Sequence, residues 1–185
     1  MARSNHGDVV AIVGGDQVGL AALLTAQFFA PAEIIMIDLD DNRLAVSQKF
    51  DATKTINSGD GKAVDKVMAM TENRGVDVAI EVVGIPATFD ICQQIIAPRG
   101  VLANVGVHGK PVNLALEKLW IQNITITTGL VDTYTTPMLL KTVKAEKISP
   151  GQLTTHHFDM DNMMDAYDTF SKAAEYQALK VIIKT

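Results

Sequence analysis

Residues 7–38 read GDVVAIVGGDQVGLAALLTAQFFAPAEIIMID, and this stretch decides the predicted fold. Asp8 to Val13 is a short run rich in β-branched residues, which is typical of a buried strand. A glycine-rich turn follows, and the apolar stretch from Val18 to Phe29 predicts a helix. Glu33 to Asp38 predicts a second strand. A strand, a crossover helix and a second strand form one βαβ unit of a parallel sheet.

The rest of the chain repeats this alternation. Strands are predicted at residues 54–56, 76–83, 101–105 and 121–128, with helical patterns between most of them. Asp60 is expected to cap one of these helices, and Pro86 suits the first turn of another, which ends before Pro98. The sequence therefore predicts an α/β fold with a doubly wound, six-stranded, parallel sheet of the Rossmann type.

A short extension is predicted to follow the sheet. After a helix at about residues 136–147, Pro150-Gly151 interrupts the chain, and residues 153–158, 163–174 and 178–183 predict a strand, a helix and a strand. We therefore divide the chain into a dinucleotide-binding domain, residues 1–149, and a C-terminal extension, residues 150–185.

The turn at residues 14–19 reads GGDQVG and carries the predicted chemistry. Dinucleotide folds need glycines here for a tight turn, for close approach of the pyrophosphate and for close helix packing. Gly14 and Gly19 occupy the first and third glycine positions, but Asp16 occupies the second. A carboxylate about 4 Å from a phosphate oxygen repels it by roughly 4 kcal/mol at an effective dielectric of about 20. Turning Asp16 toward water would relieve that repulsion, so the turn predicts either a bound dinucleotide or a weakened site.

Asp38 ends the second predicted strand, where a carboxylate can accept hydrogen bonds from the adenosine ribose hydroxyls. The same carboxylate would repel the 2′-phosphate of NADP, so NAD is the expected cofactor. The alternative is that Asp38 or Asp40 only caps the following helix, although Asp40 and Asp41 are better placed for capping.

Composition limits the classes of partner. A formal net charge of −5 argues against nucleic acid, which needs a basic surface, and no apolar run is long enough to span a membrane. The single cysteine, Cys92, allows no internal disulfide, and the short polar start predicts no signal peptide. We therefore expect a cytoplasmic protein.

Four stretches together resemble the zinc-type medium-chain alcohol dehydrogenases. These are residues 7–38, GVDVAIEVVG at 75–84, ANVGVH at 103–108 and ALKVII at 178–183. The family's first turn usually reads Gly-x-Gly-x-Val-Gly, so Asp16 departs from it. The resemblance implies hydride transfer between an alcohol or carbonyl and NAD in the full-length family. It also implies that residues from about 153 onward resemble the segment that returns to the family's catalytic domain.

The resemblance also implies roles for individual residues. Val18 would pack on the nicotinamide, Arg43 would lie near the adenosine ribose, and Lys180 would lie near the pyrophosphate. The loop at residues 105–107 would line the nicotinamide pocket, and residues 128 and 130 would offer backbone groups to the carboxamide. The implied cofactor-binding residues are Gly14, Gly15, Asp16, Gln17, Val18, Gly19, Asp38, Arg43, Val83, Val105, Gly106, Val107, Thr128, Leu130 and Lys180. Ordinary core or strand-end packing remains the alternative for the valines, and a solvated surface charge for Arg43 and Lys180.

The family's catalytic zinc is held by a cysteine and by the histidine of a Gly-His-Glu segment, neither of which matches this chain. Cys92 lies within a helical pattern, where a small buried residue is expected. We therefore predict no metal ligand and no catalytic residue here, and no turnover by this chain alone. The unpartnered tail, or the edge of the sixth strand, predicts a homo-oligomer, a dimer or tetramer.

Other candidates are weaker. His156 and His157 adjoin on a predicted strand and point to opposite faces, so they are not expected to share a metal. His108 follows the fifth strand, where it would contact a nucleotide or be solvated. Tyr176 and Lys180 have a short-chain dehydrogenase spacing, but in a strand pattern. The alternative function is a non-catalytic remnant or oligomerisation module whose nucleotide binding Asp16 weakens.

Overall fold

The computed structural model describes residues 4–130 and 133–185 and divides the chain into two compact units, Met1–Leu130 and Val131–Thr185. The boundary between the compact units therefore lies at 130/131, before the boundary at 149/150 that the sequence suggested between the dinucleotide-binding domain and the extension. The helix at Thr136–Lys144 belongs to the second unit. The functional division stays a prediction, because compactness is a different criterion.

The first unit is built on one parallel sheet with the order β3-β2-β1-β4-β5-β6. The strands are β1 Val9–Val13, β2 Glu33–Asp38, β3 Lys54–Asn57, β4 Val76–Glu81, β5 Ile96–Asn104 and β6 Thr125–Thr128. This order confirms the predicted doubly wound α/β fold. From β1 the chain adds β2 and β3 on one side of the sheet, and then β4, β5 and β6 on the other. In such a sheet a crevice for ligands forms at the carboxyl ends of the strands where the two halves meet, here between β1 and β4.

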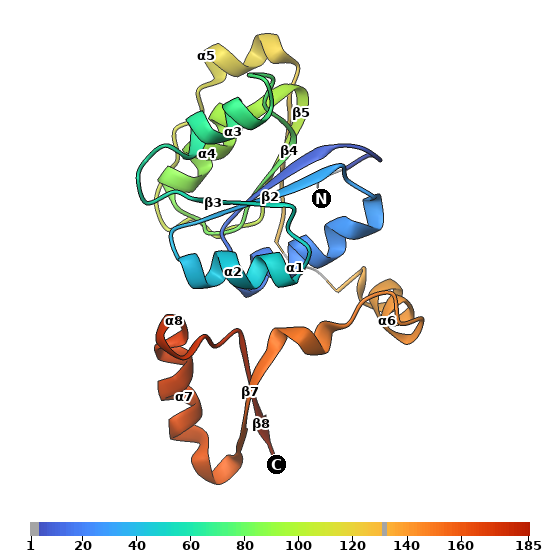
Figure 1. The fold of residues 1–185 in the computed structure, drawn as a ribbon, viewed down its shortest axis with the longest axis vertical. Helices are drawn as coiled ribbons and strands as arrows, with labels where there is room; N and C mark the ends of the chain where they lie inside the picture. The colour runs from blue at the N-terminus through green and yellow to red at the C-terminus, as the bar shows by residue number, and fades with distance from the viewer. Residues whose placement is uncertain (1–3, 131–132) are drawn as a thin grey trace. The chain divides into compact units, whose positions relative to one another are not determined.

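Helices cover both faces of this sheet. They are α1 Gln17–Ala26, α2 Asp41–Lys49, α3 Ala63–Met70, α4 Pro86–Ile95 and α5 Leu116–Leu119, with 3₁₀ turns η1 Gln27–Phe29 and η2 Trp120–Gln122. Figure 1 shows α1 and α2 on one side of the strands and α3 and α4 on the other. Ile12, Ile35 and Leu102 are fully buried between these layers, as near-continuous apolar strands covered on both faces require.

Three local expectations were wrong. β6 begins at Thr125 rather than Ile121, because residues 120–122 form a 3₁₀ turn and Asn123 adopts a left-handed conformation with φ of 55°. β5 spans Ile96–Asn104 rather than residues 101–105, although α4 does end before Pro98 as predicted. Lys62, not Asp60, is the residue that precedes α3, and Asp60 instead accepts a hydrogen bond from Lys62 N at 3.0 Å.

The second unit contains a small sheet of β7 Thr154–Asp159 and β8 Lys180–Lys184, which pair in parallel. Around it are α6 Thr136–Lys144, η3 Pro150–Leu153, η4 Met160–Asn162, α7 Met163–Ser171 and α8 Ala173–Tyr176. Among the described residues of this unit, the buried apolar side chains are only Ala166 and Ala178. Larger apolar side chains of α7, such as Met164 and Phe170, are exposed. In the part of the chain that the structure describes, no helix is long and apolar enough to cross a membrane.

Candidate functional site

The turn between β1 and α1 is closed by two glycines that packing requires. A Cβ on Gly14 would approach the side chains of Val83 and Val82 to 2.6 and 2.7 Å, and Gly14 has a φ of 116°. A Cβ on Gly19 would collide with the carbonyl oxygen of Gly14. The two glycines therefore let α1 begin directly against the end of β1, as the glycine spacing predicted.

Asp16 caps α1. Its side-chain Oδ1 accepts hydrogen bonds from the backbone N–H groups of Val18 at 3.0 Å and Gly19 at 3.1 Å. Those N–H groups are among the unpaired donors that a helix start offers to an anion, and the carboxylate also suits the positive end of the helix dipole. The sequence analysis considered Asp16 only as a replaced glycine, whereas aspartate is also among the preferred residues at an N-cap.

Asp38 lies beside the same turn with only 9% of its surface exposed. Its Oδ2 accepts from Gly15 N at 2.6 Å and its Oδ1 from Asp40 N at 2.9 Å, while Arg43 Nη1 lies 3.8 Å from Oδ2. Asp40, by contrast, caps α2 through bonds from Asn42 N and Arg43 N. The capping alternative for Asp38 is therefore wrong, and its carboxylate instead ties the end of β2 to the glycine turn.

The loops after β4 and β5 reach the same edge of the sheet. Val83 follows β4, and its side chain lies where a Cβ on Gly14 would point. The N–H groups of Val105 and Gly106 donate to the Glu81 carbonyl at 2.8 and 3.1 Å. Val18 in α1, Val83 and Val107 are exposed, with 46%, 44% and 81% of their surfaces accessible. These three valines therefore do not belong to the core, and packing at the strand ends stays the alternative for them. The structure brings the turn and both loops together along one edge.

The remaining predicted residues lie further along that edge or in the other unit. Thr128 ends β6 opposite Asn104 of β5, Leu130 is exposed beyond it, and Gln17 begins α1. Lys180 begins β8 of the second unit, where it pairs with Thr154. Whether any of these residues contacts a cofactor stays a prediction.

Glu81, at the end of β4, is a site residue that the sequence analysis missed. Its side chain is fully buried and accepts hydrogen bonds from Val83 N at 3.0 Å, Gly84 N at 2.8 Å and Thr88 Oγ1 at 2.6 Å. A carboxylate at the last position of a buried strand, which Asp38 also occupies, was the signal that could have found it.

His108 is not solvated, which corrects one of its two alternatives. Its side chain is 16% exposed, its Nε2 lies 2.7 Å from Asn104 Oδ1, and its ring meets that of Phe89 edge to face at 6.0 Å. The histidine therefore belongs to the packed interior behind the loop.

Within the described ranges, no three His, Cys, Asp or Glu side chains are grouped so that they could hold a metal ion. Cys92 is fully buried in α4, and burial first, with the nearby Glu81 charge second, raises the pKa of its thiol well above the ordinary value. A buried thiol that stays protonated is a poor metal ligand. These residues therefore do not fit the zinc of the family that the sequence resembles.

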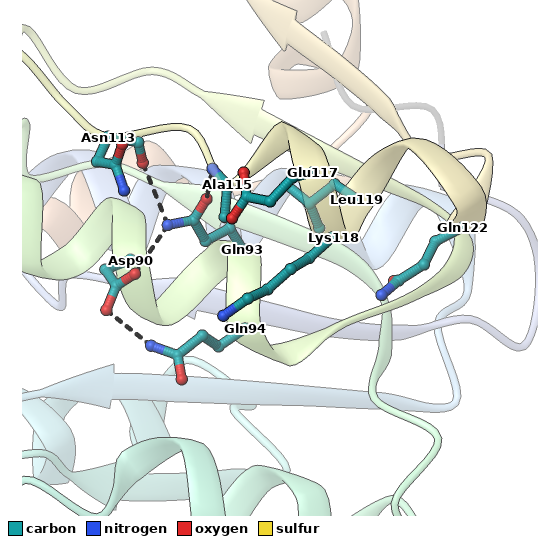
Figure 2. Close-up of a pocket in the computed structure, with 9 residues that line it drawn as sticks. All are labelled: Asp90, Gln93, Gln94, Asn113, Ala115, Glu117, Lys118, Leu119 and Gln122. Atoms are coloured by element: carbon teal, nitrogen blue, oxygen red, sulfur yellow. Dashed lines mark hydrogen bonds between the residues drawn. The ribbon is translucent and has the colours of Figure 1, made fainter.

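A separate polar pocket of about 530 Å³ lies between α4 and residues 113–122 (Figure 2). Gln93 spans it, because its Nε2 donates to Asp90 Oδ1 at 2.7 Å and to the Asn113 carbonyl at 3.2 Å, and its Oε1 accepts from Ala115 N at 3.0 Å. All polar groups of Gln93 are thus used within the protein, and the pocket contains none of the predicted site residues.

Residues 18–145 match the sequence family described as zinc-binding dehydrogenase. The chain is 31% identical over 182 residues to an alcohol dehydrogenase of Cupriavidus necator, and 28% identical over 189 residues to a sorbitol dehydrogenase of Bacillus subtilis. Each match covers 96% of this chain and 50% of the relative, so the chain spans about half the length of these curated relatives.

The chain is also similar to about half of each of two solved alcohol dehydrogenase structures. Zinc dependent alcohol dehydrogenase 2 from Streptococcus pneumonia, in its apo form, is 56% identical with a TM-score of 0.93, and the match covers 98% of this chain and 52% of that one. Alcohol dehydrogenase TADH from Thermus sp. ATN1 is 26% identical with a TM-score of 0.89, covering 97% and 52%.

Proposed function

This chain belongs to the zinc-binding dehydrogenase family, and from that premise we propose that it is the NAD(H)-binding part of an alcohol dehydrogenase-like oxidoreductase. In such an enzyme hydride passes between an alcohol or carbonyl and NAD. The observation that carries the proposal is Asp38, whose carboxylate lies at the end of β2 and bonds to Gly15 N of the glycine turn at 2.6 Å. This is the position from which an acid reads the adenosine ribose in dinucleotide folds.

NAD is proposed over NADP on charge grounds. Asp38 is almost fully buried, and Nη1 of Arg43 lies 3.8 Å from its Oδ2. A 2′-phosphate placed beside this carboxylate would meet a fixed negative charge, and Arg43 is already drawn toward Asp38. Two ribose hydroxyls, in contrast, can both donate to carboxylate oxygens.

Asp16 supports a second candidate function, a remnant or oligomerisation module with weakened nucleotide binding. A pyrophosphate at the start of α1 would need the N–H groups that Asp16 now occupies, at 3.0 and 3.1 Å. Binding would require the carboxylate to swing away and give up two hydrogen bonds, each worth about 0.5–1.5 kcal/mol. Reduced affinity, rather than loss of the fold, is the expected consequence.

Turnover by this chain alone is not proposed. The family's zinc ligands come from segments that residues 1–185 do not contain, and the zinc and the substrate pocket are therefore assigned to the full-length family rather than to these residues. The identity of the alcohol or carbonyl depends on that pocket.

We also propose that the chain forms a homo-oligomer in the cytoplasm. β6 pairs only with β5 in the described sheet, and next to it Trp120 and Ile121 are 67% and 69% exposed. An open strand edge beside exposed apolar side chains favours association. The buried state of Cys92 suits a reducing compartment as well as an oxidising one, so cell fractionation is needed for the location. Light scattering during gel filtration tests the oligomer, and a monomer at micromolar concentration would overturn it.

NADH titration by calorimetry and thermal shift tests the proposed function. NADH at a hundredfold over its dissociation constant should stabilise the chain by about 2.7 kcal/mol. Asp16→Gly should bind more tightly than the native chain, because it frees the two N–H groups. Asp40→Gly is the matched control, because it removes the similar cap of α2 and should not tighten binding. If neither the native chain nor Asp16→Gly binds NADH, the cofactor role is wrong.

A further inference from the structure

The buried Glu81 side chain is saturated on one oxygen and unpaired on the other. Oε1 accepts three hydrogen bonds, from Val83 N, Gly84 N and Thr88 Oγ1, whereas Oε2 is buried without a hydrogen-bond partner among the described residues. A buried carboxylate oxygen without a partner costs free energy, so its retention needs a reason. His108 Nε2 lies 3.5 Å from Oε2.

The neighbours of His108 determine which ring nitrogen carries the proton. Asn104 Nδ2 donates to the Gly106 carbonyl at 3.0 Å, so its Oδ1 is left to accept from His108 Nε2 at 2.7 Å. Nε2 is therefore the protonated nitrogen, and it lies between Asn104 Oδ1 and Glu81 Oε2. Among the residues that the structure describes, the buried His108 Nδ1 has no hydrogen-bond partner, so Nε2 is the ring nitrogen that makes polar contacts.

The two loops that carry these residues are in direct contact. A Cβ on Gly84, after β4, would collide with the Val107 carbonyl oxygen, and a Cβ on Gly106, after β5, would collide with Gly84 N and Glu81 Oε2. The Glu81 carbonyl accepts from Val105 N and Gly106 N as well. Glu81 thus bonds to the first loop with its side chain and to the second with its backbone.

We propose that Glu81 is a positioning residue whose carboxylate, together with the His108 ring, clamps the loop after β4 to the loop after β5. The clamp sets the relative position of Val83 and of residues 105–107, which form one edge of the nucleotide crevice. This role rests on the proposed NAD(H) binding for its purpose, but the clamp itself is a property of the fold. It acts through two features that an apolar filling would lack: the buried carboxyl oxygen Oε2, and the N–H group of Nε2, which donates to Asn104 Oδ1 and lies 3.5 Å from Oε2.

Four variants test the clamp. Glu81→Gln keeps the shape and an acceptor for Val83 and Gly84 but replaces Oε2 by a donor, which then faces the His108 N–H. His108→Phe keeps a ring against Phe89 and removes the N–H, whereas His108→Gln retains an N–H donor. The fourth combines Glu81→Gln with His108→Phe. Val67→Ala, in α3 and fully buried, is the control for lost stability alone.

Two readouts separate this proposal from the proposed function. Amide hydrogen exchange at Val83, Gly84, Val105 and Gly106 is measured without cofactor, and NADH dissociation constants are measured beside it. Each single variant, Glu81→Gln and His108→Phe, should accelerate loop exchange and weaken NADH binding by about tenfold, and the double variant should be no worse than either. His108→Gln should have most of the slow loop exchange and tight NADH binding of the native chain.

The outcomes are distinct. The clamp would be overturned if the double variant multiplied the losses of NADH affinity of the two single variants. It would also be overturned if the loops of Glu81→Gln exchanged no faster than those of Val67→Ala. If the native chain does not bind NADH but the exchange results appear as expected, the clamp stands and the proposed function fails. If the chain binds NADH and the variants exchange and bind as the native chain does, the clamp fails alone.

Discussion

The Asp16 carboxylate lies 3.0 Å from the backbone nitrogen of Val18 and accepts its hydrogen bond. Val18 is in the first turn of α1, which is the part of a dinucleotide fold that offers N–H groups to phosphate. The protein therefore carries its own anion at that helix start. This carboxylate stabilises the start of α1 and competes with phosphate for the same N–H groups.

Asp16→Ala and Asp16→Gly should differ in stability but agree in binding. Replacing an N-cap aspartate by alanine costs about 0.5–2 kcal/mol, whereas glycine costs only a few tenths. Urea unfolding should therefore rank the native chain and Asp16→Gly close together and Asp16→Ala below them. Both variants free the Val18 and Gly19 N–H groups, so calorimetry should give tighter NADH binding for both. Tighter binding by the glycine variant alone would mean that backbone freedom, not the carboxylate, limits affinity.

Asp38→Asn should change the preference between the two nicotinamide cofactors. The amide keeps an oxygen that can accept from Gly15 N, whereas its NH2 group replaces the oxygen that accepts from Asp40 N, and the negative charge beside the ribose is lost. Repulsion of a 2′-phosphate should fall, and Arg43 should be free to attract it. We expect the ratio of NADPH to NADH affinity to rise by about tenfold, which corresponds to about 1.4 kcal/mol. Competition between the two cofactors for the same sample measures it, and an unchanged ratio would remove Asp38 from cofactor selection.

The layers of the fold follow from local pattern. Short runs of β-branched residues that alternate with helical stretches predicted the strands of the sheet, and β2 was predicted with the bounds observed, Glu33–Asp38. The start of β6 was not predictable in this way. Residues 120–122 are apolar enough for a strand, but they form a 3₁₀ turn, and the left-handed Asn123 separates them from β6. Apolar runs alone do not distinguish these two conformations.

The site was predictable where one turn carries it. The spacing of Gly14 and Gly19 and the position of Asp38 needed only the sequence of one βαβ unit. The Glu81–His108 contact needed the register of β4 against β5, which pairs Glu81 with Asn104 and so brings the following loops together. That register depends on packing across the sheet, which a pattern along one strand does not contain.

Gly19→Ala should destabilise the first unit severely. The added Cβ would collide with the Gly14 carbonyl oxygen, and because this atom belongs to the backbone at the end of β1, neither group can move without shifting α1 from the sheet. A loss of about 3 kcal/mol is expected from overpacking of this kind. Gly109→Ala is the matched control, because nothing lies within 4 Å of its added Cβ. Urea unfolding of the pair measures the difference, and equal midpoints would show that the α1 start is not closely packed.

Acidification should weaken the fold in part through Asp77 of β4. Burial opposes ionisation of this carboxyl, but hydrogen bonds from Arg74 and from Val9 N outweigh burial and hold its pKa below the ordinary value. A carboxyl with a depressed folded-state pKa binds fewer protons in the folded than in the unfolded state. Its contribution to stability is therefore complete above the unfolded-state pKa, about 3.9, and is lost as the pH falls through the folded-state pKa.

Asp77→Asn tests this dependence, because the amide can still accept from Val9 N at the start of β1 but cannot pair with the Arg74 guanidinium. Unfolding free energies measured between pH 7 and about pH 3 should show a shallower acid decline for the variant than for the native chain. Asp65→Asn, which removes an acid in the first turn of α3 that forms no ion pair among the described residues, is the matched control. Parallel acid slopes for Asp77→Asn and the native chain would mean that other carboxyls bring about acid unfolding.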